Sequence, residues 1–220
     1  MERIFNASNY FSQTSSEMLR NIFRGKLSSE ELLKDNYIIK GMKIGLSFLS
    51  KDNKRNTMYD MLGNELTHSS IYLKLESLEE STGVIVQYGK YEYFKGLYKV
   101  NGKIINNCGF PYGKEGGLMF GEMSNDLFNS HYCTVGILSL ILSKKHYKMT
   151  LKTFLEKVKK IKGPWNLESY DPLKKNCHDF VVAALQVLKP SYNEQLLNIK
   201  SGNNIPIAIK NELNKRIIEI

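Results

Sequence analysis

Cys177 lies where a helix can turn a thiol into a nucleophile. Asn176 before it is a favoured N-cap residue, and Asp179 falls at the third helical position. The residues that follow recur at the spacing of one buried helix face: Phe180, Val181, Ala184, Leu185 and Leu188. The helix dipole favours a thiolate in the first turn, and the charges of Lys174 and Lys175 act in the same direction. The position predicts a nucleophilic cysteine; the alternative is a small buried hydrophobic residue.

A nucleophilic thiol needs a base, and three of the four histidines are poor candidates. His178 follows Cys177 directly, but consecutive helical side chains point about 100° apart, so we expect His178 to be exposed or to cap the helix. His131 and His146 stand in weakly patterned segments that are typical of a surface. The candidate base is therefore His68.

His68 opens a segment that alternates like a strand. One side of this strand carries residues expected in the core: Ser69, Ile71, Leu73 and Leu75. His68 shares the other side with Ser70 and Tyr72. Since a histidine at the start of a strand can project toward an adjacent helix terminus, we expect His68 to reach Cys177 as a general base.

The histidine strand and the cysteine turn together resemble a known family. A histidine that starts a strand with Ile71, Tyr72 and Leu73 behind it, followed later by an Asn-Cys-x-x-Phe turn into a helix, is similar to the circularly permuted papain-like thiol hydrolases of the NlpC/P60 superfamily. In that superfamily the histidine precedes the cysteine along the chain. The resemblance covers about residues 42–190.

Two branches of the superfamily resemble this chain most. The LRAT-like acyltransferases and phospholipases carry an N-C-E-H-F box, which resembles 176–180 here. The PPPDE peptidases, which remove ubiquitin-like or SUMO-like modifiers, carry an N-C-N-x-F box and an aromatic strand similar to 92–96. The chain departs from both, because Ser69 replaces the LRAT-type tryptophan and His178 replaces the second PPPDE asparagine. These departures leave the substrate open.

The resemblance implies a role for each matching residue. Cys177 is the nucleophile and His68 the general base, and Gln87, on the next strand, orients the imidazole. The alternative for Gln87 is an ordinary exposed strand residue. Trp165 and Tyr170, shortly before the nucleophile, are expected to form a wall of the substrate cleft, unless they are packing residues. Ser70 is expected to contact the substrate as well.

The implied chemistry is acyl transfer through a thioester. The thiolate attacks a carbonyl, the Cys177 N–H donates to the oxyanion, and water or a second nucleophile releases the acyl group. This chemistry calls for no metal and no cofactor. We expect a peptidase or isopeptidase on amide bonds; the alternatives are an LRAT-like acyltransferase or phospholipase on lipid esters, and a non-catalytic binding module.

The elements that must position these residues predict an α+β fold, in which an antiparallel sheet packs on the cysteine-bearing helix. The expected organisation is a helical extension over 1–41, a permuted papain-like domain over 42–190 and a second helical extension over 191–220. Strands are expected from Met42 onward, and helices at about 150–161, 177–188 and 205–220. The glycine-rich segment 106–121 reads as a loop that lines or gates the cleft, and 133–142 is ambiguous between strand and helix.

Composition limits the setting and the partners. The chain has 220 residues, three cysteines and a net charge of +9. Three cysteines are too few for a disulfide scaffold, and the sequence contains neither a secretory signal nor a long apolar run, so we expect a cytoplasmic, reducing location. The positive charge suits anionic membrane surfaces or acidic partners, but without an arginine cluster or RNA-binding motif we do not expect nucleic-acid binding. The oligomeric state is left open.

Overall fold

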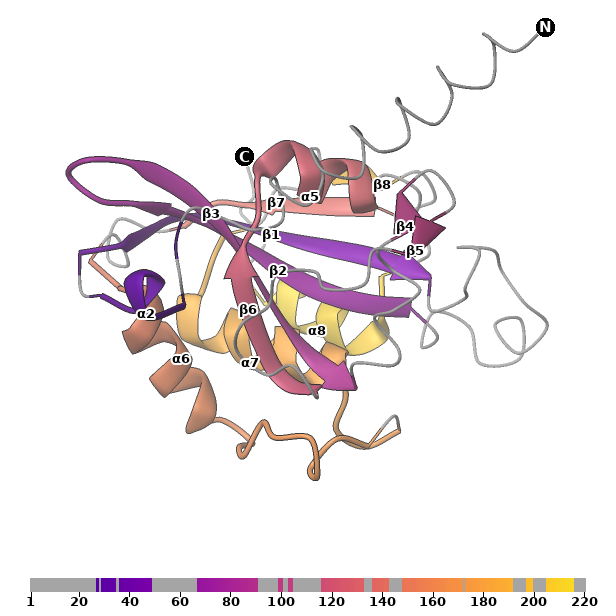
Figure 1. The fold of residues 1–220 in the computed structure, drawn as a ribbon. Helices are drawn as coiled ribbons and strands as arrows, with labels where there is room; N and C mark the ends of the chain where they lie inside the picture. The colour runs from indigo at the N-terminus through magenta and orange to yellow at the C-terminus, as the bar shows by residue number, and fades with distance from the viewer. Residues whose placement is uncertain are drawn as a thin grey trace, which may run out of the picture.

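A six-stranded antiparallel sheet organises the computed structural model of this chain (Figure 1). The structure describes residues 27, 29–34, 36–48, 67–90, 99–100, 103–104, 116–132, 136–142, 148–171, 173–191, 197–199 and 205–215. The sheet order is β6-β3-β2-β1-β7-β8, with β1 Ile38–Phe48, β2 Thr67–Glu76, β3 Ser81–Lys90, β6 Gly116–Glu122, β7 Gly136–Leu140 and β8 Leu197–Ile199. Two short strands, β4 Lys99–Val100 and β5 Lys103–Ile104, pair separately.

Helices cover both faces of this sheet (Figure 1). On one face α7, Cys177–Leu188, packs against β2 and β3, and it also contacts α6, Leu151–Lys159, and α8, Ile207–Asn214. On the other face α5, Asn125–Tyr132, packs against β1 and β7. The short α2, Ser29–Leu32, contacts β6. The main core lies between the sheet and the helices α6, α7 and α8. The α+β class is thereby confirmed.

The pairing of β2 with β3 stops before either strand ends. Ile71 pairs with Val86 at the last position of the ladder, whereas β2 continues back to Thr67 and β3 continues on to Lys90. The later residues of β3 pair with β6 instead, and the first residues of β2 keep their pairing with β1. The two strands therefore part near Ser70 and Gln87, and side chains meet there in place of a backbone ladder.

The start of α7 is fixed by its cap. The Asn176 side chain accepts hydrogen bonds from the N–H groups of His178 and Asp179, and the Asp179 carboxylate accepts from the Asn176 N–H, which completes a capping box. The helix ends at Leu188; the C-cap residue Lys189 has a left-handed φ of 43°, and Pro190 follows. Local sequence signals at both ends therefore place Cys177 in the first turn.

The structure confirms several expected elements and corrects others. The three later helices, α6, α7 and α8, lie where periodicity predicts them, and the ambiguous segment 133–142 contains a strand, β7. The sheet begins at Ile38 rather than Met42, because Tyr37 and Ile39 already face the core. The end of the glycine-rich segment is also not a loop, since β6 pairs there with β3. The expected C-terminal extension contributes β8 to the sheet as well as a helix.

Some expectations fall outside the described residues. These are residues 1–26 of the expected N-terminal helical extension, the aromatic strand at 92–96 and the surface positions of His131 and His146, of which only the backbone of His131 is described. In the part of the chain that the structure describes, no helix has the length and apolar character needed to span a membrane.

Candidate active site

The thiol of Cys177 lies at the N-terminus of α7, against the start of β2. The residue is 3% exposed. Its Sγ is 3.9 Å from the Thr67 carbonyl oxygen and 3.8 Å from Nδ1 of His178. Both contacts are long for hydrogen bonds, as is usual when sulfur is involved. The helix terminus thus places the thiol among polar groups contributed by a strand and by its own first turn.

The imidazole of His68 is held where β2 and β3 part. Its Nε2 is 3.2 Å from Oε1 of Gln87 and 3.0 Å from Oγ of Ser70, and the Ser70 hydroxyl donates to the same Gln87 oxygen at 3.1 Å. Because an amide oxygen can only accept, the contact with Gln87 requires the proton on Nε2. All three side chains are buried. Gln87 therefore contacts His68 as expected and is not an exposed strand residue.

The electrostatics of the site favour a thiolate. Burial by itself raises the pKa of the Cys177 thiol, because it removes water from the charged form. The positive charges of His178 and His68, and hydrogen bonds from both side chains, act in the opposite direction and outweigh burial. As a result the pKa of Cys177 lies well below its ordinary value. A lowered thiol pKa in a protein is typical of a reactive cysteine.

The expectation for His178 is wrong. His178 is neither exposed nor a cap, since it is 2% exposed and its Nδ1 lies between Sγ of Cys177 and Oγ of Ser69, which is 3.0 Å away. The 100° argument considers only the direction in which each side chain leaves the helix. Nδ1 is close enough to its own backbone to lie near the preceding residue despite that direction. Its partner Ser69 is on β2, so only the packing of α7 on the sheet reveals this contact.

The residues expected to contact the substrate have structural partners within the protein. Ser70 is fully buried and belongs to the network of His68 and Gln87. The indole N–H of Trp165 donates to the Val158 carbonyl oxygen at 3.0 Å, and its ring meets Phe180 edge to face with 5.5 Å between centroids. Trp165 is therefore a core residue.

Tyr170 also packs instead of standing free. It is partly buried, with its ring centroid 5.3 Å from that of Tyr88 in the core. These contacts support the packing alternative for Tyr170 and Trp165.

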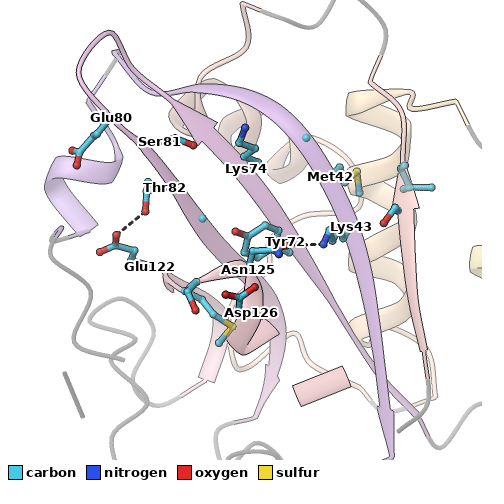
Figure 2. Close-up of a pocket in the computed structure, with 16 residues that line it drawn as sticks. Met42, Lys43, Tyr72, Lys74, Glu80, Ser81, Thr82, Glu122, Asn125 and Asp126 are labelled. Carbon is cyan, nitrogen blue, oxygen red and sulfur yellow. Dashed lines mark hydrogen bonds between the residues drawn. The ribbon is translucent and has the colours of Figure 1, made fainter. Parts of the chain in front are cut away.

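Cys177 lines none of three hollows that described residues form. One of them, of about 1090 Å³, lies on the sheet face that carries α5, between Lys43, Tyr72, Lys74 and the start of α5 (Figure 2). Lys43 donates there to Asn125 at 2.6 Å and Thr82 donates to Glu122 at 2.6 Å. Cys177 does not line this hollow. Because Cys177 is 3% exposed, a substrate reaches its sulfur only when the groups that cover it move.

No group of three or more histidine, cysteine or acidic side chains in the described part of the chain has the arrangement of a metal site. The chemistry of the cluster is that of a thiol with imidazoles. A scan against protein-family models, a search of curated proteins and a search of solved structures found no match to this chain.

Proposed function

We propose that this chain is a cysteine hydrolase that acts through an acyl-enzyme on Cys177. One observation carries the proposal: the thiol is at a helix N-terminus with a lowered pKa and a hydrogen bond from His68, and Gln87 and Ser70 hold that imidazole. A thiol, a base and a group that orients the base are the parts that nucleophilic catalysis needs. In a purely structural role, a small buried cysteine would need none of these polar partners.

The first half of the reaction forms a thioester. Because Nε2 of His68 carries a proton toward Gln87, Nδ1 is the ring nitrogen that takes the thiol proton. The thiolate then adds to the substrate carbonyl carbon. The cap of α7 uses the N–H groups of His178 and Asp179, so the N–H of Cys177 is the first-turn donor for the oxyanion. Collapse of the tetrahedral intermediate breaks the C–N bond, and the leaving amine receives the proton from His68.

The second half restores the enzyme. Water gives a proton to His68 and its oxygen adds to the thioester carbonyl. The C–S bond breaks, the sulfur leaves as a thiolate, and the product is a carboxylic acid. Atoms and protons balance with water as the only co-reactant.

We propose a permuted papain-like fold and an amide substrate. Several observations support the fold proposal: the histidine precedes the cysteine in the chain, the sheet is antiparallel, and the cysteine helix packs against the histidine strand. A peptide or an isopeptide of a ubiquitin-like modifier is the first substrate class. Lipid esters, as for an LRAT-like acyltransferase or phospholipase, are the second, and a binding module is the non-catalytic alternative.

An active-site probe tests the proposal directly. In a Cys108→Ser, Cys133→Ser background, a small electrophilic thiol probe labels Cys177, and labelling is lost in Cys177→Ala. His68→Ala slows both labelling and acyl-enzyme formation, which intact mass spectrometry detects with peptide, ubiquitin-like and phospholipid substrates. Equal labelling with and without Cys177, or acylation at full rate without His68, rejects the proposal.

A further inference from the structure

Two imidazoles contact the thiol of Cys177, and the proposed reaction uses only one of them. His68 reaches it from β2, and His178 reaches it from the first turn of α7. His178 is 2% exposed, so it has been removed from water almost completely. Burying a polar ring is unfavourable unless its nitrogens are paired, and here Nδ1 lies 3.0 Å from Ser69 Oγ and 3.8 Å from Cys177 Sγ.

We infer that His178 is a second catalytic histidine, which donates from Nδ1 to the Cys177 sulfur and stabilises the thiolate, while His68 carries protons. This inference rests on the proposed nucleophilic role of Cys177. Ser69 fixes the imidazole of His178 from the neighbouring strand, as Ser70 and Gln87 fix that of His68. The charge of an imidazolium at this distance from a buried sulfur is a large effect, since Coulomb energies grow as the surroundings lose water.

The two roles separate because the two rings have different partners. His68 is connected to Gln87 and Ser70 through Nε2, which leaves its other nitrogen to exchange a proton with the sulfur and the leaving group. His178 keeps its proton and supplies a fixed donor throughout the cycle. No bond forms or breaks at His178.

Few other charged groups face this pair among the described residues. Asp179 lies in the same helical turn. Its carboxylate accepts a hydrogen bond from the Asn176 N–H at 3.1 Å and forms an ion pair with Lys162 at 3.2 Å. Of the titratable groups on β2, His68 acts on the thiol, and from the preceding loop Lys175 donates to the Pro164 carbonyl. The two imidazoles are thus the groups expected to set the titration of the thiol.

The first test titrates the thiolate by its ultraviolet absorbance in the Cys108→Ser, Cys133→Ser background, with the same protein carrying Cys177→Ala subtracted. This readout needs neither a substrate nor an open groove. His178→Asn, which keeps a polar group and loses the charge, is expected to raise the thiol pKa by about one unit or more, which is about tenfold less thiolate at a fixed pH below the transition. His68→Ala gives the comparison. If His68→Ala moves the transition and His178→Asn does not, the inference is wrong.

The second test does not depend on a histidine variant that folds. Linkage is reciprocal, so removal of the thiolate by Cys177→Ala must change the titration of every imidazole that stabilises it. Nuclear magnetic resonance of labelled histidines is expected to show shifts at two rings, His68 and His178; a shift at His68 alone overturns the inference. If both histidine titrations change but no substrate forms an acyl-enzyme, the proposed hydrolase is rejected and the stabilisation of the thiolate by two histidines is supported. Acyl-enzyme formation with an unchanged His178 titration supports the proposed hydrolase and rejects the role of His178.

Discussion

At the residue scale, the candidate site is a thiol whose protonation is controlled by neutral and cationic partners. None of the contacts described for this thiol is with a carboxylate. Gln87 orients His68 without adding a negative charge. A carboxylate in that place would compete with the thiolate for the positive charge of the imidazole. The Cys177 thiolate therefore remains the main anion in this buried cluster, which is consistent with a pKa well below the ordinary value.

The lowered pKa of Cys177 predicts how its reactivity depends on pH. The thiolate is the reactive form, and it is lost only as pH falls through the lowered pKa. The rate of alkylation by iodoacetamide should therefore rise less between pH 7 and pH 9 at Cys177 than at a free thiol with a pKa of about 8.5, whose rate rises steeply over this range. Glutathione in the same buffer is the control. A profile at Cys177 that follows glutathione would show that the cluster does not stabilise the thiolate.

Gln87→Ala is expected to impair the base without removing it. The substitution leaves the Nε2 proton of His68 and the hydroxyl of Ser70 without their common acceptor. A buried unsatisfied donor costs about 1–3 kcal/mol of folding free energy, and a misplaced base lowers the rate by up to about a hundredfold. Denaturant unfolding and acyl-enzyme formation measure the two effects. Gln186→Ala, on a half-buried part of α7, is the matched control and should leave acylation unchanged.

At the scale of elements, α7 serves as both a core helix and the platform of the thiol. Its buried face fixes the helix against β2 and β3, and its capping box fixes where the first turn begins. The same cap occupies the N–H groups of His178 and Asp179. The cap therefore affects the stability of the helix and the choice of oxyanion donor together.

Two substitutions at Asn176 separate these effects. Asn176→Ala removes the side-chain acceptor and should lower the free energy of unfolding by about 0.5–2 kcal/mol. Asn176→Asp keeps the acceptor and should retain stability, but its negative charge beside the sulfur should raise the thiol pKa. Urea unfolding and the thiolate titration measure each variant. Equal stability of Asn176→Ala and wild type would contradict the role of the cap.

Gly83 tests how closely the sheet packs on the α5 side. A Cβ at this position would lie 1.9 Å from the hydroxyl oxygen of Tyr72 and 2.5 Å from the Met123 carbonyl oxygen. Tyr72 is itself packed against Phe128, with 5.0 Å between ring centroids. Gly83→Ala should therefore destabilise the fold by about 1–3 kcal/mol.

Thermal unfolding measures the change at Gly83. Gly41→Ala is the control, because its Cβ would approach only the Lys74 Cβ, at 3.3 Å. If the two variants unfold alike, Tyr72 moves aside more easily than the packing implies.

At the scale of the whole molecule, the sequence predicts what depends on neighbouring residues and misses what depends on packing. The cap at Asn176, the bounds of α7 and the strand that carries His68 follow from local patterns, and all are present. The contact of His178 with Ser69 joins residues 109 positions apart, and no periodicity encodes it. The burial of Trp165 and the parting of β2 from β3 are likewise properties of the assembled sheet and helices.

The charge of the whole molecule makes a further prediction about partners. The net charge is +9, and a hollow of about 650 Å³ beside the ends of α6 and α7 is lined by four lysines: Lys148, Lys157, Lys160 and Lys189. Its other lining residues are uncharged and include Met149, Ile161 and Val187, so this region is a cationic surface that also presents apolar side chains. Such a surface is suited to anionic lipid head groups, which would bring a lipid-ester substrate to the enzyme.

We therefore expect the protein to sediment with phosphatidylserine vesicles and not with neutral phosphatidylcholine vesicles, and expect binding to weaken as salt is added. The double substitution Lys157→Ala, Lys160→Ala removes two charges at about 1 kcal/mol each, so partitioning should fall about thirtyfold. The control, Lys74→Ala with Lys210→Ala, changes the net charge equally outside this hollow and should have a much smaller effect. If the two pairs of substitutions weaken binding equally, net charge alone attracts the vesicles. If the wild-type protein does not bind the vesicles, lipid esters lose this support as substrates relative to amides.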